Sequence, residues 1–233
     1  IQGLPQVAPE DTIREVKRLT GRLVAINLEP AAIKNNEEES VWNLTTGRQA
    51  TVDNARKAAD MGVDMIVLTG NPGVGVDNEA IMQALSKLKD AVGDRVILTA
   101  GKMHASGIIS EAGEKILTEK DIVDFIDAGA DVILLPAPGT VPGITMEYAG
   151  KLIKKAHEKG ALAMTTIGTS QEGADEDTIR QIALMCKMAG ADIHHIGDSG
   201  YMGMALPENI TAYSVAIRGK RHTYRRMAMS LLR

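Results

Sequence analysis

Short apolar runs recur along the chain, and each is followed by a stretch whose apolar residues have helical spacing. In three places a predicted helix ends at a glycine, a short side chain and an aspartate follow, and an apolar strand begins: MGVDMIVLTG (61–70), AGADVILLPAPG (128–139) and AGADIHHIGDSG (189–200). Glycine suits the left-handed cap that ends a helix before a strand. Uninterrupted Val, Ile and Leu runs are typical of parallel strands buried on both faces.

Weaker copies of the pattern occur at 21–30, 93–102 and 159–168, so that six strands are predicted to begin near residues 22, 63, 95, 130, 161 and 191. Helices are predicted at 50–61, 77–92, 118–128, 145–159 and 176–189, with a further helix at 10–20. Strict alternation of strands and helices predicts a parallel sheet with right-handed crossovers.

We expect this sheet to close into a barrel, because an open sheet usually leaves a short, polar edge strand and none of the six strands has that character. A TIM (βα)8 barrel has eight strands in about 250 residues. The six visible strands are therefore expected to be the third to the eighth, with the first strands upstream of Ile1. Residues 1–233 then form one α/β-barrel domain, in which 1–21 enters as a helix and 206–233 is helical. A doubly wound open sheet is the alternative.

Composition narrows the function classes. The chain is 44% hydrophobic, has a net charge of −4 and contains 3% aromatic residues, which argues against a nucleic-acid partner. No apolar run reaches the roughly 18 residues of a membrane span. The single Cys186 excludes an internal disulfide and fits a reducing compartment, so a cytoplasmic protein is expected. Because the sequence begins at Ile1, a removed signal peptide stays open as an alternative.

The last two predicted strands end in glycine-rich polar loops. Gly190-Ala191-Asp192 and four apolar-run residues are followed by Gly197-Asp198-Ser199-Gly200, and the preceding strand ends in Gly168-Thr169-Ser170. These tips resemble those of phosphate-binding barrels such as tryptophan synthase α-subunits and ribulose-phosphate epimerases. The resemblance implies that an anionic substrate contacts both loops. Asp198 departs from the pattern, since a carboxylate at that step would repel a phosphate.

The whole chain also resembles a bacterial barrel family labelled haloacid-dehalogenase-like hydrolase or phosphonomutase-like. A dehalogenase would need an Asp-x-Asp nucleophile motif after a strand, and the sequence has none there. This resemblance therefore implies the fold alone, and the reaction has to be inferred from the residues at the strand tips.

Three residues at predicted strand tips are the catalytic candidates. Successive strand residues point to opposite faces, and counting from Asp192 places His195 inside the barrel and His194 against the helices. An inward imidazole could act as a general acid or base. Glu29 shares its face with Asn27, for which we expect a buried hydrogen-bond partner, and Lys102 could fix an anion or form a Schiff base. A core histidine and solvated strand ends are the alternatives.

Other segments near the tips have weaker signals. The loop 69–78, with Asn71, has glycines but neither a P-loop nor a dinucleotide fingerprint, so we expect substrate contact and no nucleotide cofactor. Residues 31–49, which include Trp42, are a candidate lid. The basic segment 217–227 predicts a subunit contact in a homo-oligomer or a solvated helix face.

We expect an enzyme that removes a proton next to a carbonyl of a small phosphorylated or carboxylated metabolite, as an isomerase or C–C lyase does. His195 or Glu29 would move the proton, and Lys102 would neutralise negative charge. Two alternatives stay open: a metabolite-sensing barrel without catalysis, and a metal-dependent hydrolase. The metal ligands of the latter would be Glu29, His104, His195 and Asp198.

Overall fold

The computed structural model describes residues 8–31, 45–70, 75–104, 112–169, 171–197 and 205–229. These residues form one six-stranded sheet in which every neighbouring pair is parallel and the spatial order follows the sequence. The strands are β1 (Ala25–Leu28), β2 (Met65–Leu68), β3 (Ile97–Gly101), β4 (Val132–Pro136), β5 (Leu162–Ile167) and β6 (Ile193–Ile196). Strand and helix alternate as predicted.

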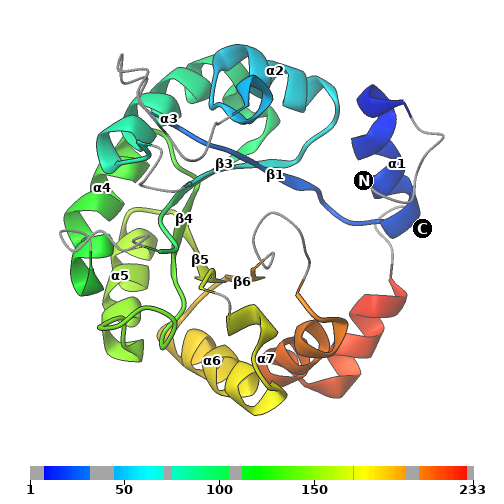
Figure 1. The fold of residues 1–233 in the computed structure, drawn as a ribbon, viewed down its shortest axis with the longest axis vertical. Coiled ribbons are helices and arrows are strands. Elements are labelled where there is room, and N and C mark those ends of the chain that lie inside the picture. The colour runs from blue at the N-terminus through cyan, green and yellow to red at the C-terminus, as the bar shows by residue number, and fades with distance from the viewer. Residues whose placement is uncertain are drawn as a thin grey trace.

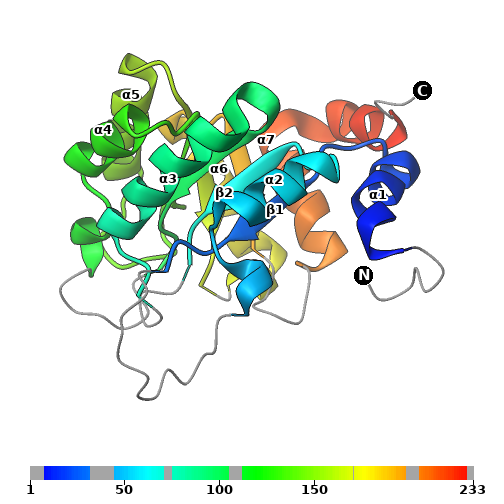
Figure 2. The same ribbon diagram turned by 90° about the horizontal axis from the view of Figure 1, so that it is seen from above.

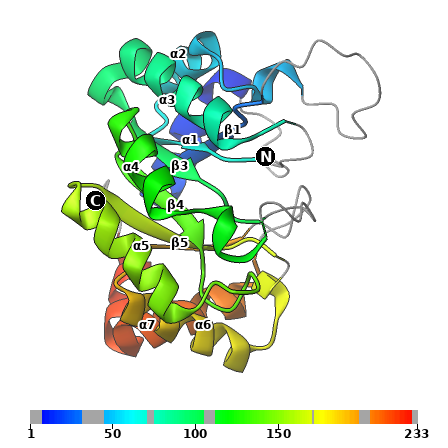
Figure 3. The same cartoon turned by 90° about the vertical axis from the view of Figure 1, so that its left-hand side faces the viewer.

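Seven α-helices accompany the strands in the described residues. They are α1 (Thr12–Thr20), α2 (Val52–Asp60), α3 (Asn78–Val92), α4 (Glu119–Asp127), α5 (Met146–Glu158), α6 (Glu176–Ala189) and α7 (Pro207–Ala228). The helices lie outside the curled sheet, and α3, α4 and α5 follow one another along its convex face (Figures 1 and 3). A doubly wound sheet would carry helices on both faces, so the sequential strand order and the one-sided helix layer contradict that alternative.

The expected closure into a barrel is not seen in the described residues. The sheet runs from β1 to β6, and these two strands are its edges. Across the gap between them, α1 lies beside the end of α7 (Figures 1 and 2), where the Arg22 guanidinium donates to the main-chain oxygen of Arg226. The fold is an α/β half-barrel of six units. Six strands at barrel curvature leave the outer edges apart, because closure at this curvature takes about eight.

Local sequence signals explain where the helices begin and end. Five helices begin at a Thr or Asp whose side chain accepts a backbone N–H three residues later: Thr51, Asp77, Thr118, Thr145 and Asp175. Such caps satisfy amide groups that have no partner inside the helix. The predicted glycine positions before β2, β4 and β6 all have positive φ, with values of 91°, 114° and 97° at Gly62, Gly129 and Gly190.

The aspartate of the repeated motif joins strands in pairs. Asp131 donates its main-chain N–H to Leu98 O (2.8 Å), and its Oδ2 accepts the main-chain N–H of Leu98 (2.9 Å). Asp64 makes the same two bonds with Val24, and Asp192 makes them with Ala163. Each aspartate therefore holds the amino-terminal end of its own strand to that of the preceding strand.

Apolar side chains fill both sides of the sheet. The larger cluster lies between sheet and helices and includes the fully buried Phe125. On the concave side, Val132, Leu134 and Met164 are buried. Four partly buried apolar side chains pack against them: Met65 and Val67 of β2, Met103 just after β3, and Ile193 of β6. The inner surface of the sheet is thus apolar in its middle, and the predicted catalytic residues lie at the strand ends.

The basic segment forms the second half of α7. Gly219 has non-helical angles (φ 78°, ψ 162°), so the helix is kinked there, and the side chains beyond it are mostly exposed. No helix of the described residues is both long enough and apolar enough to cross a membrane. The homo-oligomer expected from the basic segment stays a prediction.

Candidate functional site

The three predicted catalytic residues lie along the side of the sheet at which the carboxyl ends of its strands meet, called the carboxyl edge below. Glu29 directly follows β1, Lys102 directly follows β3, and His195 is the third residue of β6. Because all six strands are parallel, their carboxyl ends share this edge. In barrel enzymes the active site is built at the carboxyl ends of the strands. This edge is therefore the candidate site.

His195 points to the concave side, as the alternation of strand residues predicts. Ile193, two residues earlier, packs in the inner cluster, whereas His194 faces the helices and its Nδ1 lies 3.0 Å from the hydroxyl of Tyr213. His195 Nδ1 is hydrogen-bonded to Thr166 Oγ1 at 2.5 Å, and Thr166 is fully buried beside it on β5. This bond fixes the ring orientation.

Glu29 is a buried carboxyl group at the end of β1. Its side chain forms an ion pair with Arg48, and the main chain is held by the bond from Glu29 N to Arg48 O (2.7 Å). Burial raises the pKa of Glu29, and the charge of Arg48 only partly offsets this. A side chain at Gly70 would come within 3.1 Å of Glu29 Oε2, so the carboxyl group lies over the end of β2.

The prediction for Asn27 is wrong in one respect. Asn27 is exposed rather than buried, because β1 is an edge strand of the described sheet. With its amide nitrogen turned toward β2, Asn27 donates to Val67 O (2.8 Å) and Thr69 O (3.2 Å). Its hydrogen-bond partners are main-chain oxygens of the neighbouring strand. Asn27 is therefore not a buried amide inside a closed barrel.

Lys102 is almost completely buried, with 3% of its surface exposed, so the solvated-loop alternative for this residue is wrong. The strand before it approaches β4 closely: a Cβ on Gly101 would lie 1.8 Å from Leu134 O. Two residues on, His104 is partly buried, and burial lowers the pKa of its imidazole. At neutral pH His104 is therefore uncharged.

Other side chains contact the loop residues that are predicted to bind an anion. The side chain of Met103 covers Gly168, since a Cβ there would lie 2.6 Å from the Met103 sulfur. The hydroxyl of Thr169 donates to Gln171 Oε1 at 2.8 Å. These contacts weigh against a phosphate site at Gly168, which stays a prediction. Five predicted contact residues lie outside the described residues: Asn71, Ser170, Asp198, Ser199 and Gly200. Trp42 of the candidate lid also lies outside them.

The structure adds Glu172, which the sequence analysis missed. It lies in a short 3-10 helix (Gln171–Gly173) after β5 and is 4% exposed. Its carboxyl group lies against Gly197, the residue after β6: a Cβ on Gly197 would be 3.1 Å from Glu172 Cδ. Its signal in the sequence is its place just beyond a strand tip, next to the Gly168-Thr169-Ser170 loop that the resemblance assigns to phosphate binding.

Metal ligation has no ready cluster in the part of the chain that the structure describes. No group of three or more His, Cys, Asp or Glu side chains there could hold a metal ion. The predicted ligands Glu29, His104 and His195 do not form such a group, and Asp198 lies outside the described residues.

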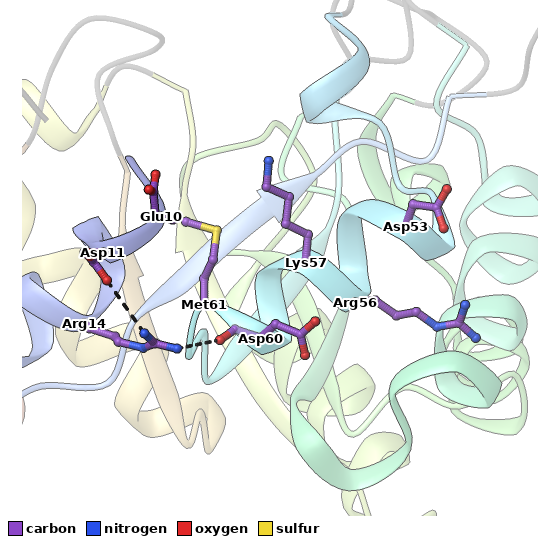
Figure 4. A pocket seen from close by; sticks show the side chains of 8 residues that line it. All are labelled: Glu10, Asp11, Arg14, Asp53, Arg56, Lys57, Asp60 and Met61. Carbon is purple, nitrogen blue, oxygen red and sulfur yellow. Dashed lines mark hydrogen bonds and ion pairs between the residues drawn. The ribbon is translucent and has the colours of Figure 1, made fainter. Parts of the chain in front are cut away.

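A hollow of about 450 Å³ lies elsewhere, in the helix layer between α1 and α2 (Figure 4). It is open to solvent, and its charged side chains are partly paired with one another: Arg14 donates to Asp60 O (3.2 Å) and lies 3.7 Å from Asp11. None of its lining residues is a predicted site residue. It gives no reason to move the candidate site from the strand ends.

Similar proteins agree with a barrel-type fold. The tetrameric deoxyribose phosphate aldolase from Aeropyrum pernix superimposes with a TM-score of 0.57 at 15% identity, covering 91% of this chain and 81% of the aldolase. A protein described as a "putative phosphonomutase" from Burkholderia cenocepacia J2315 gives 0.53 at 17% identity, covering 90% of this chain and 81% of that one. At these identities the likeness shows the fold alone. The haloacid-dehalogenase-like label has no support in these similarities.

A sequence relative is named as an epimerase. Over 89 residues the chain is 37% identical to a Haemophilus influenzae protein named "Putative N-acetylmannosamine-6-phosphate 2-epimerase", covering 38% of this chain. The match spans only 33% of the length of that relative. Residues 1–233 match the family described as "Domain of unknown function (DUF7916)", and the chain belongs to this family.

Proposed function

We propose that this protein is an enzyme of the isomerase or lyase type that removes a proton next to a carbonyl of a small anionic metabolite. One observation carries the proposal: an inward histidine fixed by Thr166, a buried carboxyl group and a buried lysine occupy the carboxyl edge of one curled parallel sheet. Titratable groups kept out of water at such an edge are typical of active sites.

In the proposed reaction, His195 transfers the proton. Its Nδ1 is hydrogen-bonded to Thr166, and the proposal assigns the exchange of the proton with the substrate to Nε2. Imidazole suits this task because its ordinary pKa lies near neutrality. Glu29 is the second acid or base, since burial raises its pKa toward the working range. Lys102 supplies positive charge for the enolate oxygen or the anionic group of the substrate.

The named relative supports this class of reaction. A 2-epimerase of N-acetylmannosamine 6-phosphate, as the Haemophilus influenzae protein is named, acts at a carbon of a phosphorylated sugar. The aldolase neighbour supports the barrel-type fold on which such sites are built. The substrate of this chain remains part of the proposal.

The test is proton exchange in D2O. Purified protein is incubated with N-acetylmannosamine 6-phosphate or with 2-deoxyribose 5-phosphate. Proton NMR then follows the loss of the signal of the proton on the carbon next to the carbonyl group. Protein-dependent exchange supports the proposal. Binding of these compounds without exchange or turnover would favour the metabolite-sensing alternative instead.

Lys102 has two proposed roles that borohydride separates. A Schiff base between Lys102 and a carbonyl substrate would be reduced to a stable adduct, which mass spectrometry of the peptide containing Lys102 detects. A lysine that acts as a fixed charge gives no adduct. Lys102→Arg then keeps exchange in the second case and abolishes it in the first.

A further inference from the structure

Glu172 is a buried carboxyl group with an unsatisfied oxygen. Among the described residues its Oε2 has no hydrogen-bond partner, although the residue is only 4% exposed. The ion pairs found in that part of the chain do not include it. A buried polar atom without a hydrogen-bond partner destabilises the folded state. Such a group is expected to have a role that compensates for its cost.

The main chain around Glu172 is held firmly. Asn209, which is 2% exposed in the first turn of α7, donates from Nδ2 to the main-chain oxygens of Glu172 and Ala174, both at 2.8 Å. On the other side, Gln171 donates from Nε2 to Gly139 O (3.2 Å) in the loop after β4. The carboxyl group is therefore placed by two neighbouring elements and not by a partner of its own.

Its position is between the ends of β5 and β6, on the edge that carries the candidate site. Gly197 follows β6 two residues after His195, and a Cβ on Gly197 would lie 3.1 Å from Glu172 Cδ, so the two residues pack closely. An ionised carboxylate accepts hydrogen bonds and donates none. A carboxylate at this place therefore matches a ligand that presents donors, such as hydroxyl groups, and does not match the oxygens of a phosphate.

We propose that Glu172 is a substrate-binding residue that accepts hydrogen bonds from hydroxyl groups of a sugar-like substrate, so that the ends of β5 and β6 receive the hydroxylated part of the substrate. The inference rests on the proposed function for the nature of the ligand, a small phosphorylated carbonyl compound. It places the anionic group elsewhere on the edge, toward the buried Lys102.

Calorimetric titration with two probes tests the inference. Ribose 5-phosphate carries hydroxyls and a phosphate, whereas inorganic phosphate has no sugar hydroxyls. For Glu172→Gln we expect the affinity for ribose 5-phosphate to fall about tenfold, as loss of a charged hydrogen bond implies, and that for inorganic phosphate to stay within about twofold. The matched control is Glu147→Gln, which neutralises an exposed glutamate on α5 and should change neither. No binding of ribose 5-phosphate to the wild type, equal affinity of the variant, or a parallel loss for both probes overturns the inference.

A stability measurement separates binding from a structural role. Replacing the unsatisfied carboxyl by an apolar side chain of similar length, Glu172→Met, should raise the thermal unfolding midpoint by a few degrees, on the order of 2–8 °C. Glu147→Met should leave it unchanged. A lower midpoint for Glu172→Met would mean that the carboxyl group holds the fold, and would overturn the inference.

The two proposals fail in distinguishable ways. Weaker ribose 5-phosphate binding by Glu172→Gln, together with no proton exchange in the wild type, leaves the binding inference standing and removes the proposed reaction. Exchange in the wild type with an unchanged KM in Glu172→Gln does the reverse. A rise in KM at constant kcat is the result expected if both hold.

Discussion

The two ends of the sheet treat their polar groups in opposite ways. At the amino-terminal end, Asp64, Asp131 and Asp192 each exchange two hydrogen bonds with the preceding strand, and a cationic or imidazole side chain contacts each carboxylate: Lys17, Lys89 and His157 respectively. At the carboxyl end, some buried polar groups are paired, such as Glu29 with Arg48, but two buried side-chain oxygens have no partner among the described residues.

The contrast with the amino-terminal end rests on particular atoms at the carboxyl end. Thr69 Oγ1 and Glu172 Oε2 are buried there and have no hydrogen-bond partner among the described residues. Burial raises the pKa of Glu29 despite its ion pair. Polar groups satisfied by one another stabilise a fold, whereas unsatisfied ones are kept at a cost in stability where a ligand can use them. We therefore expect loss of a polar side chain at the amino-terminal end to lower stability, and loss of a candidate site side chain at the carboxyl end to lower the proposed activity.

The largest expected effect is that of Gly101→Ala at the carboxyl end of β3. The new Cβ would lie 1.8 Å from Leu134 O, so β3 and β4 must separate. We expect a loss of about 3 kcal/mol or more in unfolding free energy, measured by urea denaturation. Gly173→Ala, where a Cβ meets nothing within 4 Å, is the control. Similar stabilities of the two variants would show that β3 and β4 can separate at this point without the expected loss of unfolding free energy.

The next effect concerns catalysis at the same edge. His195→Asn keeps a side-chain group near Nδ1 that can bond to Thr166 but has nothing at the position of Nε2. We expect proton exchange to slow about 100-fold or more, with unfolding free energy nearly unchanged. His222→Asn, on the exposed part of α7, should exchange at the wild-type rate. If His195→Asn unfolds more easily yet exchanges normally, His195 is a core residue.

At the amino-terminal end the effect should fall on stability alone. Asp131→Ala leaves the main-chain N–H of Leu98 without its acceptor and removes the contact with Lys89. We expect a loss of about 2 kcal/mol in unfolding free energy and unchanged proton exchange per folded molecule. Asp90→Ala, exposed on α3, serves as the control. A large loss of exchange in folded Asp131→Ala would break the division between the two edges.

The smallest effect is the pH dependence that Glu29 contributes. A raised pKa means that the folded protein holds this proton more tightly than the unfolded chain, so its contribution to stability is present below the ordinary value of 4.5 and is lost as the pH rises through the folded pKa. Wild type should therefore lose stability relative to Glu29→Gln as the pH rises above the ordinary value of 4.5. Urea midpoints across this range measure it, with Glu147→Gln as the matched control. A difference that stays constant with pH contradicts the raised pKa.

Much of the fold could be predicted because its signals are local. The alternation of apolar runs with helical spacing places the six strands, and the positive φ of Gly62, Gly129 and Gly190 follows from their place after helices. The period of two along a strand separates His195 from His194. The same reasoning places Glu29 and Lys102 at one edge, because parallel strands end together. Their catalytic roles stay predictions.

What only the tertiary structure decided depends on partners from distant segments. Whether a curled sheet closes depends on how many strands pair, and the described sheet ends at β1 and β6, which exposes Asn27. Glu172 is buried where its side chain packs against Gly197 and Asn209 anchors its main chain, and both of these residues come from distant segments. The motif aspartates are visible in the sequence, but their bonds to the preceding strand are not. Periodicity along the chain determines which way a residue faces, whereas burial and hydrogen bonding depend on what the rest of the chain places opposite it.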